Sequence, residues 1–200
     1  MNIPAFTSLA LIFLIVVSCQ LENEENASMS ANPPAPGFNL AHSDPAAVEL
    51  ADSVMAAMGG RPNWDRTRFI SWEFGKRKLV WDKAQGDVRI ESQPDTTVYL
   101  VNIHSLEGKV RIKGQELTES DSLKRMLSRA KSIWINDSYW LLMPFKLKDT
   151  GVTLAYLGED SIATGMKCNV LELTFENVGD TPQNKYRVYV DLNDNLVKQW

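Results

Sequence analysis

Ile70-Ser71-Trp72-Glu73-Phe74 alternates apolar with polar side chains, which is the pattern of a β-strand with one face buried and the other in water. The same alternation returns at Val88-Arg89-Ile90-Glu91 and at Val110-Arg111-Ile112, with polar stretches between the runs. Consecutive alternating runs separated by short turns predict hairpins of antiparallel sheet. This part of the chain therefore decides the fold class, which we predict to be mainly β.

Two segments that flank these strands have the spacing of helices. Ser43-Asp44-Pro45 suits a helix start and Gly59-Gly60 suits its end. A second apolar stripe predicts a helix from about Glu119 to Ile135, which Asn136-Asp137 should end. Further strands are predicted at Tyr139 to Phe145, Val152 to Leu157, Cys168 to Phe175, Tyr186 to Val190 and Leu196 to Trp200. We expect an α+β fold, with a curved antiparallel sheet or unclosed half-barrel covered by two helices.

The N-terminal stretch Val16-Val17-Ser18-Cys19 resembles the lipobox, the cleavage and acylation site of bacterial lipoproteins. The apolar segment before it, residues 10–17, is too short for a helix that spans a bilayer core of ~30 Å. Residues 1–9 contain no Lys or Arg, which departs from the usual basic start of a signal peptide. We predict a lipoprotein signal peptide over residues 1–18 and lipidation of Cys19. An ordinary signal peptide with an incidental Cys19 is the alternative.

The segment after Cys19 has the composition of a linker. Residues 19–42 are acidic and then rich in proline, as in Pro33-Pro34-Ala35-Pro36-Gly37. Such a segment predicts a disordered tether, followed by a single domain over residues 43–200. Because Trp200 lies within a strand-like run, we expect the natural C-terminus to lie further on.

Charge and motifs exclude several classes of function. Residues 1–60 carry six acidic side chains and no Lys or Arg, and the rest of the chain has no dense basic patch, so nucleic-acid binding is not expected. His42 and His104 have no partner at metal-ligand spacing, and no common catalytic motif occurs. If Cys19 is acylated, Cys168 has no cysteine with which to form an intrachain disulfide. We predict a non-enzymatic protein without cofactor or metal.

Some predicted strands have more apolar residues than one buried face needs. Val98-Tyr99-Leu100-Val101 and Tyr139-Trp140-Leu141-Leu142-Met143 are apolar on both faces. A filled core is the simpler interpretation, and a cavity for an acyl chain beneath the helix that carries Trp134 is the alternative. The candidate cavity-lining residues are Trp72, Phe74, Leu100, Trp134, Trp140 and Met143.

The order of these elements resembles the LolA-like class of periplasmic lipoprotein carriers and outer-membrane lipoprotein-sorting proteins. The runs 138–147 (SYWLLMPFKL) and 173–182 (LTFENVGDTP) are similar to a group of uncharacterised lipoproteins of diderm bacteria. The resemblance implies an unclosed barrel and no catalytic residues. A soluble carrier keeps no anchor, so Cys19 makes the chain look more like a membrane-bound acceptor.

From this resemblance we expect an envelope lipoprotein anchored by lipid, in the outer membrane, that binds a lipid or lipoprotein acyl chain on the concave face of its sheet. A structural or protein-interaction module with a filled core and no ligand is the alternative.

Overall fold

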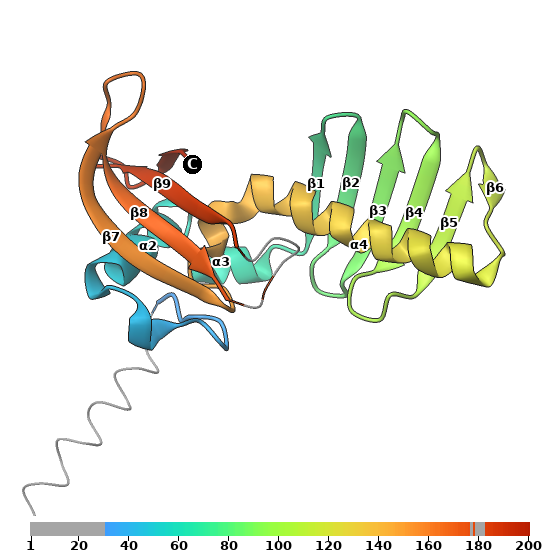
Figure 1. Cartoon of the computed structure of the whole chain (residues 1–200), viewed down its shortest axis with the longest axis horizontal. Coiled ribbons are helices and arrows are strands. Elements are labelled where there is room, and N and C mark those ends of the chain that lie inside the picture. Colours follow the sequence, from blue (N-terminus) through green and yellow to red (C-terminus); the bar gives the residue numbers. More distant parts are fainter. Residues whose placement is uncertain (1–30, 177, 179–182) are drawn as a thin grey trace, which may run out of the picture. The chain divides into compact units, whose positions relative to one another are not determined.

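The computed structural model describes residues 31–176, 178 and 183–200. All helices and strands of the described chain lie in one compact unit, Pro34–Trp200. This unit has an α+β fold with two antiparallel sheets (Figure 1). The prediction of antiparallel sheet is therefore confirmed, but the strands pair into two sheets instead of the single curved sheet that we expected.

The first sheet is a meander in which each strand pairs with the next one in the sequence. Alternation places Trp72, Leu79, Ile90, Tyr99 and Val110 in a ladder of directly opposed residues on one face. Short turns between the strands fix this register. The strands are β1 (Phe69–Phe74), β2 (Arg77–Asp82), β3 (Asp87–Ser92), β4 (Thr97–Asn102), β5 (Gly108–Ile112) and β6 (Gln115–Glu116).

The helix α4 (Ser120–Leu142) follows this sheet and is longer than the sequence predicted. Its N-cap residue is Glu119, whose carboxylate accepts hydrogen bonds from the backbone N–H groups of Asp121 and Ser122. The helix does not end at Asn136-Asp137, as predicted, but continues to Leu142. The strand predicted from residue 139 to 145 is therefore wrong, because this stretch holds the end of α4 and the 3-10 turn Met143–Lys146. Asp137 is fully buried and pairs with Arg77, so a tertiary contact outweighs its weak helix propensity.

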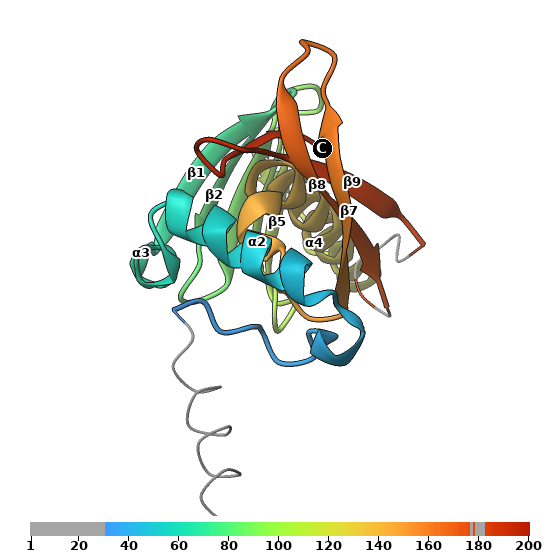
Figure 2. The ribbon, with the colours of Figure 1, turned by 90° about the vertical axis from the view of Figure 1, so that its left-hand side faces the viewer.

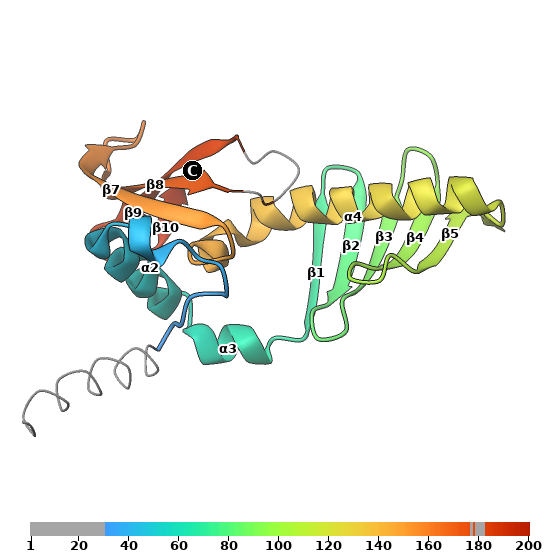
Figure 3. The same ribbon diagram turned by 60° about the horizontal axis from the view of Figure 1, so that its bottom comes forward.

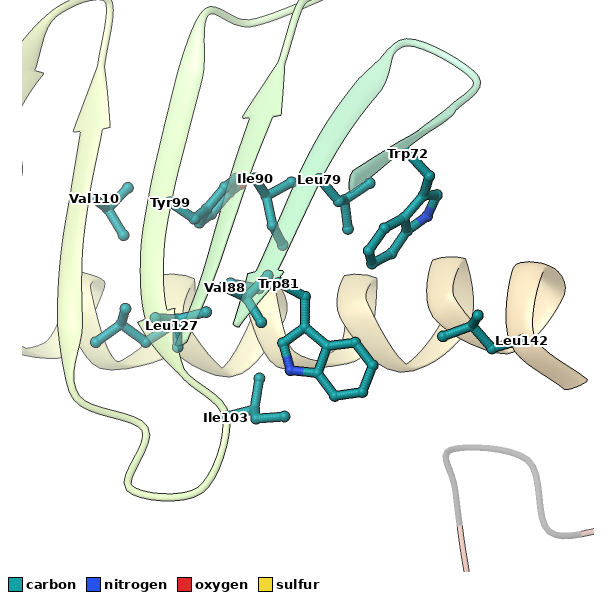
Figure 4. Close-up of a cluster of buried hydrophobic side chains, with 12 residues drawn as sticks. Trp72, Leu79, Trp81, Val88, Ile90, Tyr99, Ile103, Val110, Leu127 and Leu142 are labelled. Carbon is teal, nitrogen blue, oxygen red and sulfur yellow. The ribbon is translucent and has the colours of Figure 1, made fainter. Parts of the chain in front are cut away.

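One face of the first sheet packs against α4 and forms the first core (Figure 4). Leu127, Ala130 and Leu142 are the buried residues that α4 contributes. The buried residues from the first sheet and its turns are Trp72, Leu79, Trp81, Val88, Ile90, Tyr99, Val101, Ile103 and Val110. The opposite face of this sheet has no helix against it in the described residues.

The second sheet has the order β10-β9-β8-β7 and packs against the N-terminal helix α2 (Pro45–Ala57), as Figure 3 shows. Ala47, Ala51 and Val54 of α2 are buried in this second core, together with Met143 and Leu147. Its strands are β7 (Val152–Ser161), β8 (Lys167–Phe175), β9 (Lys185–Asp191) and β10 (Val197–Gln199). The short helix α3 (Arg61–Arg66), which was not predicted, connects α2 to β1 (Figure 2).

The structure also revises the predicted tether. The backbone N–H of Ala35 donates to the carbonyl of Lys148 at 2.9 Å, and that of Asn39 donates to Val152 at 3.0 Å. The Asn39 side chain donates to Thr153, also at 3.0 Å. Disorder is therefore wrong for residues 35–42, which end in the 3-10 turn Leu40–His42. The predicted signal peptide, Cys19 and the tether up to residue 30 lie outside the described residues.

Candidate functional site

The structure separates the six candidate cavity residues. Trp72 is buried in the first core, and Phe74 and Trp134 pack at its margin. Met143 is fully buried in the second core. The remaining two, Leu100 and Trp140, are 38% and 49% exposed. No single cavity brings all six side chains together.

Side chains of α4 fill the face of the first sheet that it covers. Trp81 and Trp134 make an edge-to-face contact with ring centroids 5.1 Å apart, and Ala130 is fully buried. The indole N–H groups of both tryptophans are shielded from solvent and have no hydrogen-bond acceptor among the described residues. The side chains between α4 and this face of the sheet form a packed cluster.

A pocket of about 210 Å³ lies where the second half of α4 meets the second sheet, and we call it the α4 pocket. Trp134, Ile135, Ser138 and Tyr139 line it from the helix, at the i, i+4 spacing of one helix face. From the other side it is lined by Val152 of β7 and Phe175 of β8, with Lys146, Asp149, Thr150 and Val178 completing the boundary.

Aromatic rings pack around Tyr139 at one wall of the α4 pocket. The ring of Tyr139 lies 6.1 Å from that of Phe175, 5.9 Å from that of Tyr186 and 5.5 Å from that of Trp200. Burial raises the pKa of Tyr139, and its hydroxyl is shielded and has no hydrogen-bond partner. Tyr139 is therefore a neutral wall residue, because its oxygen is covered and its proton is held tightly.

The boundary of the α4 pocket also carries one ion pair. The ammonium of Lys146 lies 2.8 Å from a carboxylate oxygen of Asp149, and the two side chains are 25% and 42% exposed. A pocket with apolar walls and one charged pair at its edge can hold an apolar group and orient a polar end.

A second hollow, of about 570 Å³, is an open groove on the uncovered face of the first sheet. Leu100 lines it with Phe69 and Val80, so this candidate residue does lie at a hollow, but on the face away from α4. Three of the charged side chains at this groove, Asp82, Asp87 and Arg89, already have partners. Arg68 pairs with Asp82 at 2.8 Å, and that hydrogen-bonded contact lowers the pKa of Asp82. Its open form and its mostly paired charges make this groove the weaker candidate for a small ligand.

The described residues contain no group of three His, Cys, Asp or Glu side chains that could hold a metal ion. His42 is hydrogen-bonded to Asn39 at 2.8 Å, and Cys168 is a buried free cysteine. Burial raises the pKa of Cys168, which keeps it a thiol and makes it a poor nucleophile. None of the helices in this described part is long and apolar enough to cross a membrane.

The pocket-lining residues Ile135, Ser138, Val152 and Phe175 were missed by the sequence argument. The signal was the helical spacing that continues from Trp134 and Ile135 to Ser138 and Tyr139, which the break assigned to Asn136-Asp137 concealed.

Comparison of the chain with protein-family models, with curated proteins and with solved structures gave no match. The candidate site therefore rests on its own geometry.

Proposed function

We propose that this protein is a non-enzymatic lipoprotein of the bacterial envelope, anchored through Cys19, that binds the apolar end of a lipid or acyl chain in the α4 pocket. The apolar lining of this pocket, from Trp134, Ile135, Val152 and Phe175, is the observation that carries the proposal. The lipobox-like stretch at residues 16–19 supports the anchor, and we propose that the fold is related to the unclosed LolA-like barrel.

The size of the pocket limits what it can hold. Its volume of about 210 Å³ is below the ~300–1,000 Å³ typical of pockets for drug-sized ligands. A chain end or a small apolar group fits such a space, whereas a whole lipid does not. Most of a bound lipid would therefore stay outside the pocket, in contact with water or with a partner.

The ion pair at the edge of the pocket favours an amphiphile with an anionic end. Asp149 is half-exposed and can turn into water, which would free the Lys146 ammonium for a carboxylate or phosphate of the ligand. Exchange of one anionic partner for another keeps Lys146 paired throughout.

A pocket-filling variant tests the proposal. Ile135→Trp adds bulk inside the α4 pocket, and Ser132→Trp adds the same side chain at an exposed position one turn earlier on α4. We expect a fluorescent fatty acid to bind the wild type and Ser132→Trp, and to bind Ile135→Trp at least tenfold more weakly, with melting temperatures that stay close. No binding to the wild type, or equal binding to all three proteins, would refute the pocket.

A further inference from the structure

One side of α4 is exposed to solvent along most of its length. Figure 1 shows the helix lying across one face of the first sheet, so its opposite side is turned away from that sheet. Exposed residues follow one another on this side at intervals of three or four positions, which is the spacing of a single helix face. They are Arg125, Arg129, Ser132, Asn136 and Trp140, and we call them the outer face of α4.

The surface of α4 carries charge of one sign. From Ser122 to Leu142 the helix has four basic residues, and its one acid in that range, Asp137, is fully buried and paired with Arg77. The basic residues are Lys124, Arg125, Arg129 and Lys131. None of them forms an ion pair with a carboxylate in the described part of the chain, and Arg125 donates to the hydroxyl of Ser122 at 2.7 Å. Basic side chains without acidic partners are complementary to an anionic surface.

An exposed aromatic side chain lies at the C-terminal end of the outer face. Trp140 is 49% exposed, and the centroid of its ring is 4.7 Å from that of Trp200. Tryptophan is enriched at the level of lipid headgroups, because its ring has an apolar body and a polar N–H. The outer face therefore combines the two kinds of side chain, basic and aromatic, that bind the surface of a bilayer.

We propose that the outer face of α4 docks on an anionic phospholipid surface, with Arg125 and Arg129 against the headgroups and Trp140 at their level. The inference rests on the proposed anchor at Cys19, which would hold the folded unit beside a bilayer. Sixteen residues separate Cys19 from Ala35, and a chain of that length spans at most ~55 Å. Firm membrane binding takes two signals, and a basic surface is an effective second one beside a lipid chain. Docking of α4 would also fix the orientation of the folded unit on the membrane.

Vesicle binding by the full chain tests the proposal. The protein carries Cys19→Ala, so that no acyl anchor contributes, and residues 1–18 contain no Lys or Arg that could add a preference for anionic lipid. Affinity is measured by co-sedimentation with vesicles of phosphatidylcholine and with vesicles in which a third of the lipid is phosphatidylglycerol. We expect the anionic vesicles to bind about tenfold more tightly or better. This preference should disappear in ~1 M salt, where the Debye length falls to ~3 Å.

Two double variants locate the surface. A basic residue near an anionic surface contributes about fivefold to binding, so Arg125→Gln with Arg129→Gln should weaken binding to the anionic vesicles about thirtyfold. Lys78→Gln with Lys109→Gln removes the same charge from the opposite face of the first sheet, because these residues alternate with the buried Leu79 and Val110. This control should leave the affinity nearly unchanged.

Ile135→Trp separates this surface from the α4 pocket. It changes the pocket and leaves the outer face as it is, so this variant should bind anionic vesicles as the wild type does. Failure of the pocket proposal, seen with the fluorescent fatty acid, is thereby distinguished from failure of the docking surface.

Quenching of tryptophan fluorescence by brominated phospholipid reports whether Trp140 reaches the bilayer. Trp72 and Trp81 are buried, whereas Trp140 is half-exposed, so we expect most of the quenching to disappear in Trp140→Phe. Equal affinity for the two kinds of vesicle, an equal loss in both double variants, or unchanged quenching in Trp140→Phe would overturn the proposal.

Discussion

The ion pair between Arg77 and Asp137 gives the sharpest prediction about stability. Asp137 is fully buried, and its two carboxylate oxygens accept hydrogen bonds from Arg77 Nε at 2.7 Å and Nη2 at 2.8 Å. The Asn136 side chain donates a third hydrogen bond at 2.9 Å. The contact with Asp137 raises the pKa of Arg77, so the guanidinium stays charged at any ordinary pH.

Arg77→Met keeps much of the aliphatic stem and removes the guanidinium. The Asp137 carboxylate would then be buried with only Asn136 as partner. Breaking a buried pair in this way costs ~3–5 kcal/mol of unfolding free energy. For a folded unit of this size, about 2–4 °C of melting temperature corresponds to each kcal/mol, so we expect the melting temperature to fall by roughly 6–20 °C.

The double variant Arg77→Met with Asp137→Leu is the matched control. It leaves no buried charge, so its unfolding free energy should lie within ~1 kcal/mol of the wild type. Urea and thermal denaturation followed by far-UV circular dichroism would measure all three proteins. A cost below ~1 kcal/mol for Arg77→Met, or a double variant as unstable as the single one, would refute the argument that the unpaired carboxylate sets the loss.

Three further predictions concern other parts of the chain. Ala130→Trp should lower the free energy of unfolding, measured by urea denaturation, by ~1–3 kcal/mol or more, because Ala130 is fully buried in the first core. An unchanged free energy of unfolding would mean that this core has space for the larger side chain. The pKa of Glu119 is lowered from 4.5 to about 2 by hydrogen bonds from the Ser122 side chain and from the backbone N–H groups of Asp121 and Ser122. The capping carboxylate therefore stabilises the fold above pH 4.5, and this stabilisation is lost as the pH falls towards 2. Glu119→Gln should accordingly lower the melting temperature at neutral pH and have little effect near pH 2, and an equal effect at both would contradict the cap. Cys19→Ala should abolish incorporation of a fatty-acid label in cells. Equal labelling of the wild type and of Cys19→Ala would exclude the lipobox.

The sequence predicted the first sheet well because its register is local. Ile70, Trp72 and Phe74 alternate with polar residues, and short turns connect the strands, so neighbouring residues carry the information. The helix that ends at Ala57 was also correctly placed, since Pro45 and Gly59-Gly60 mark its limits.

Prediction failed where contacts between distant segments decide the structure. The run from Tyr139 to Met143 is too short for its period to separate strand from helix. Arg77, sixty positions before Asp137, pairs with it inside the continuing helix α4, and no local pattern shows this contact. Because the helix was ended too early, Ile135 and Ser138 of the α4 pocket were missed, and Trp140 was assigned to an interior that it does not enter.

The position of α2 has a consequence for the order of folding. Val54 and Val188 are both fully buried in the second core, and these two residues come from near the two ends of the folded unit. During synthesis the hairpins of the first sheet can form soon after they emerge, because their contacts are local. The apolar face of α2 must wait for β7, β8 and β9. The chain therefore carries an uncovered apolar helix through most of its translation, which makes the nascent chain dependent on a chaperone or prone to aggregate until its last strands arrive.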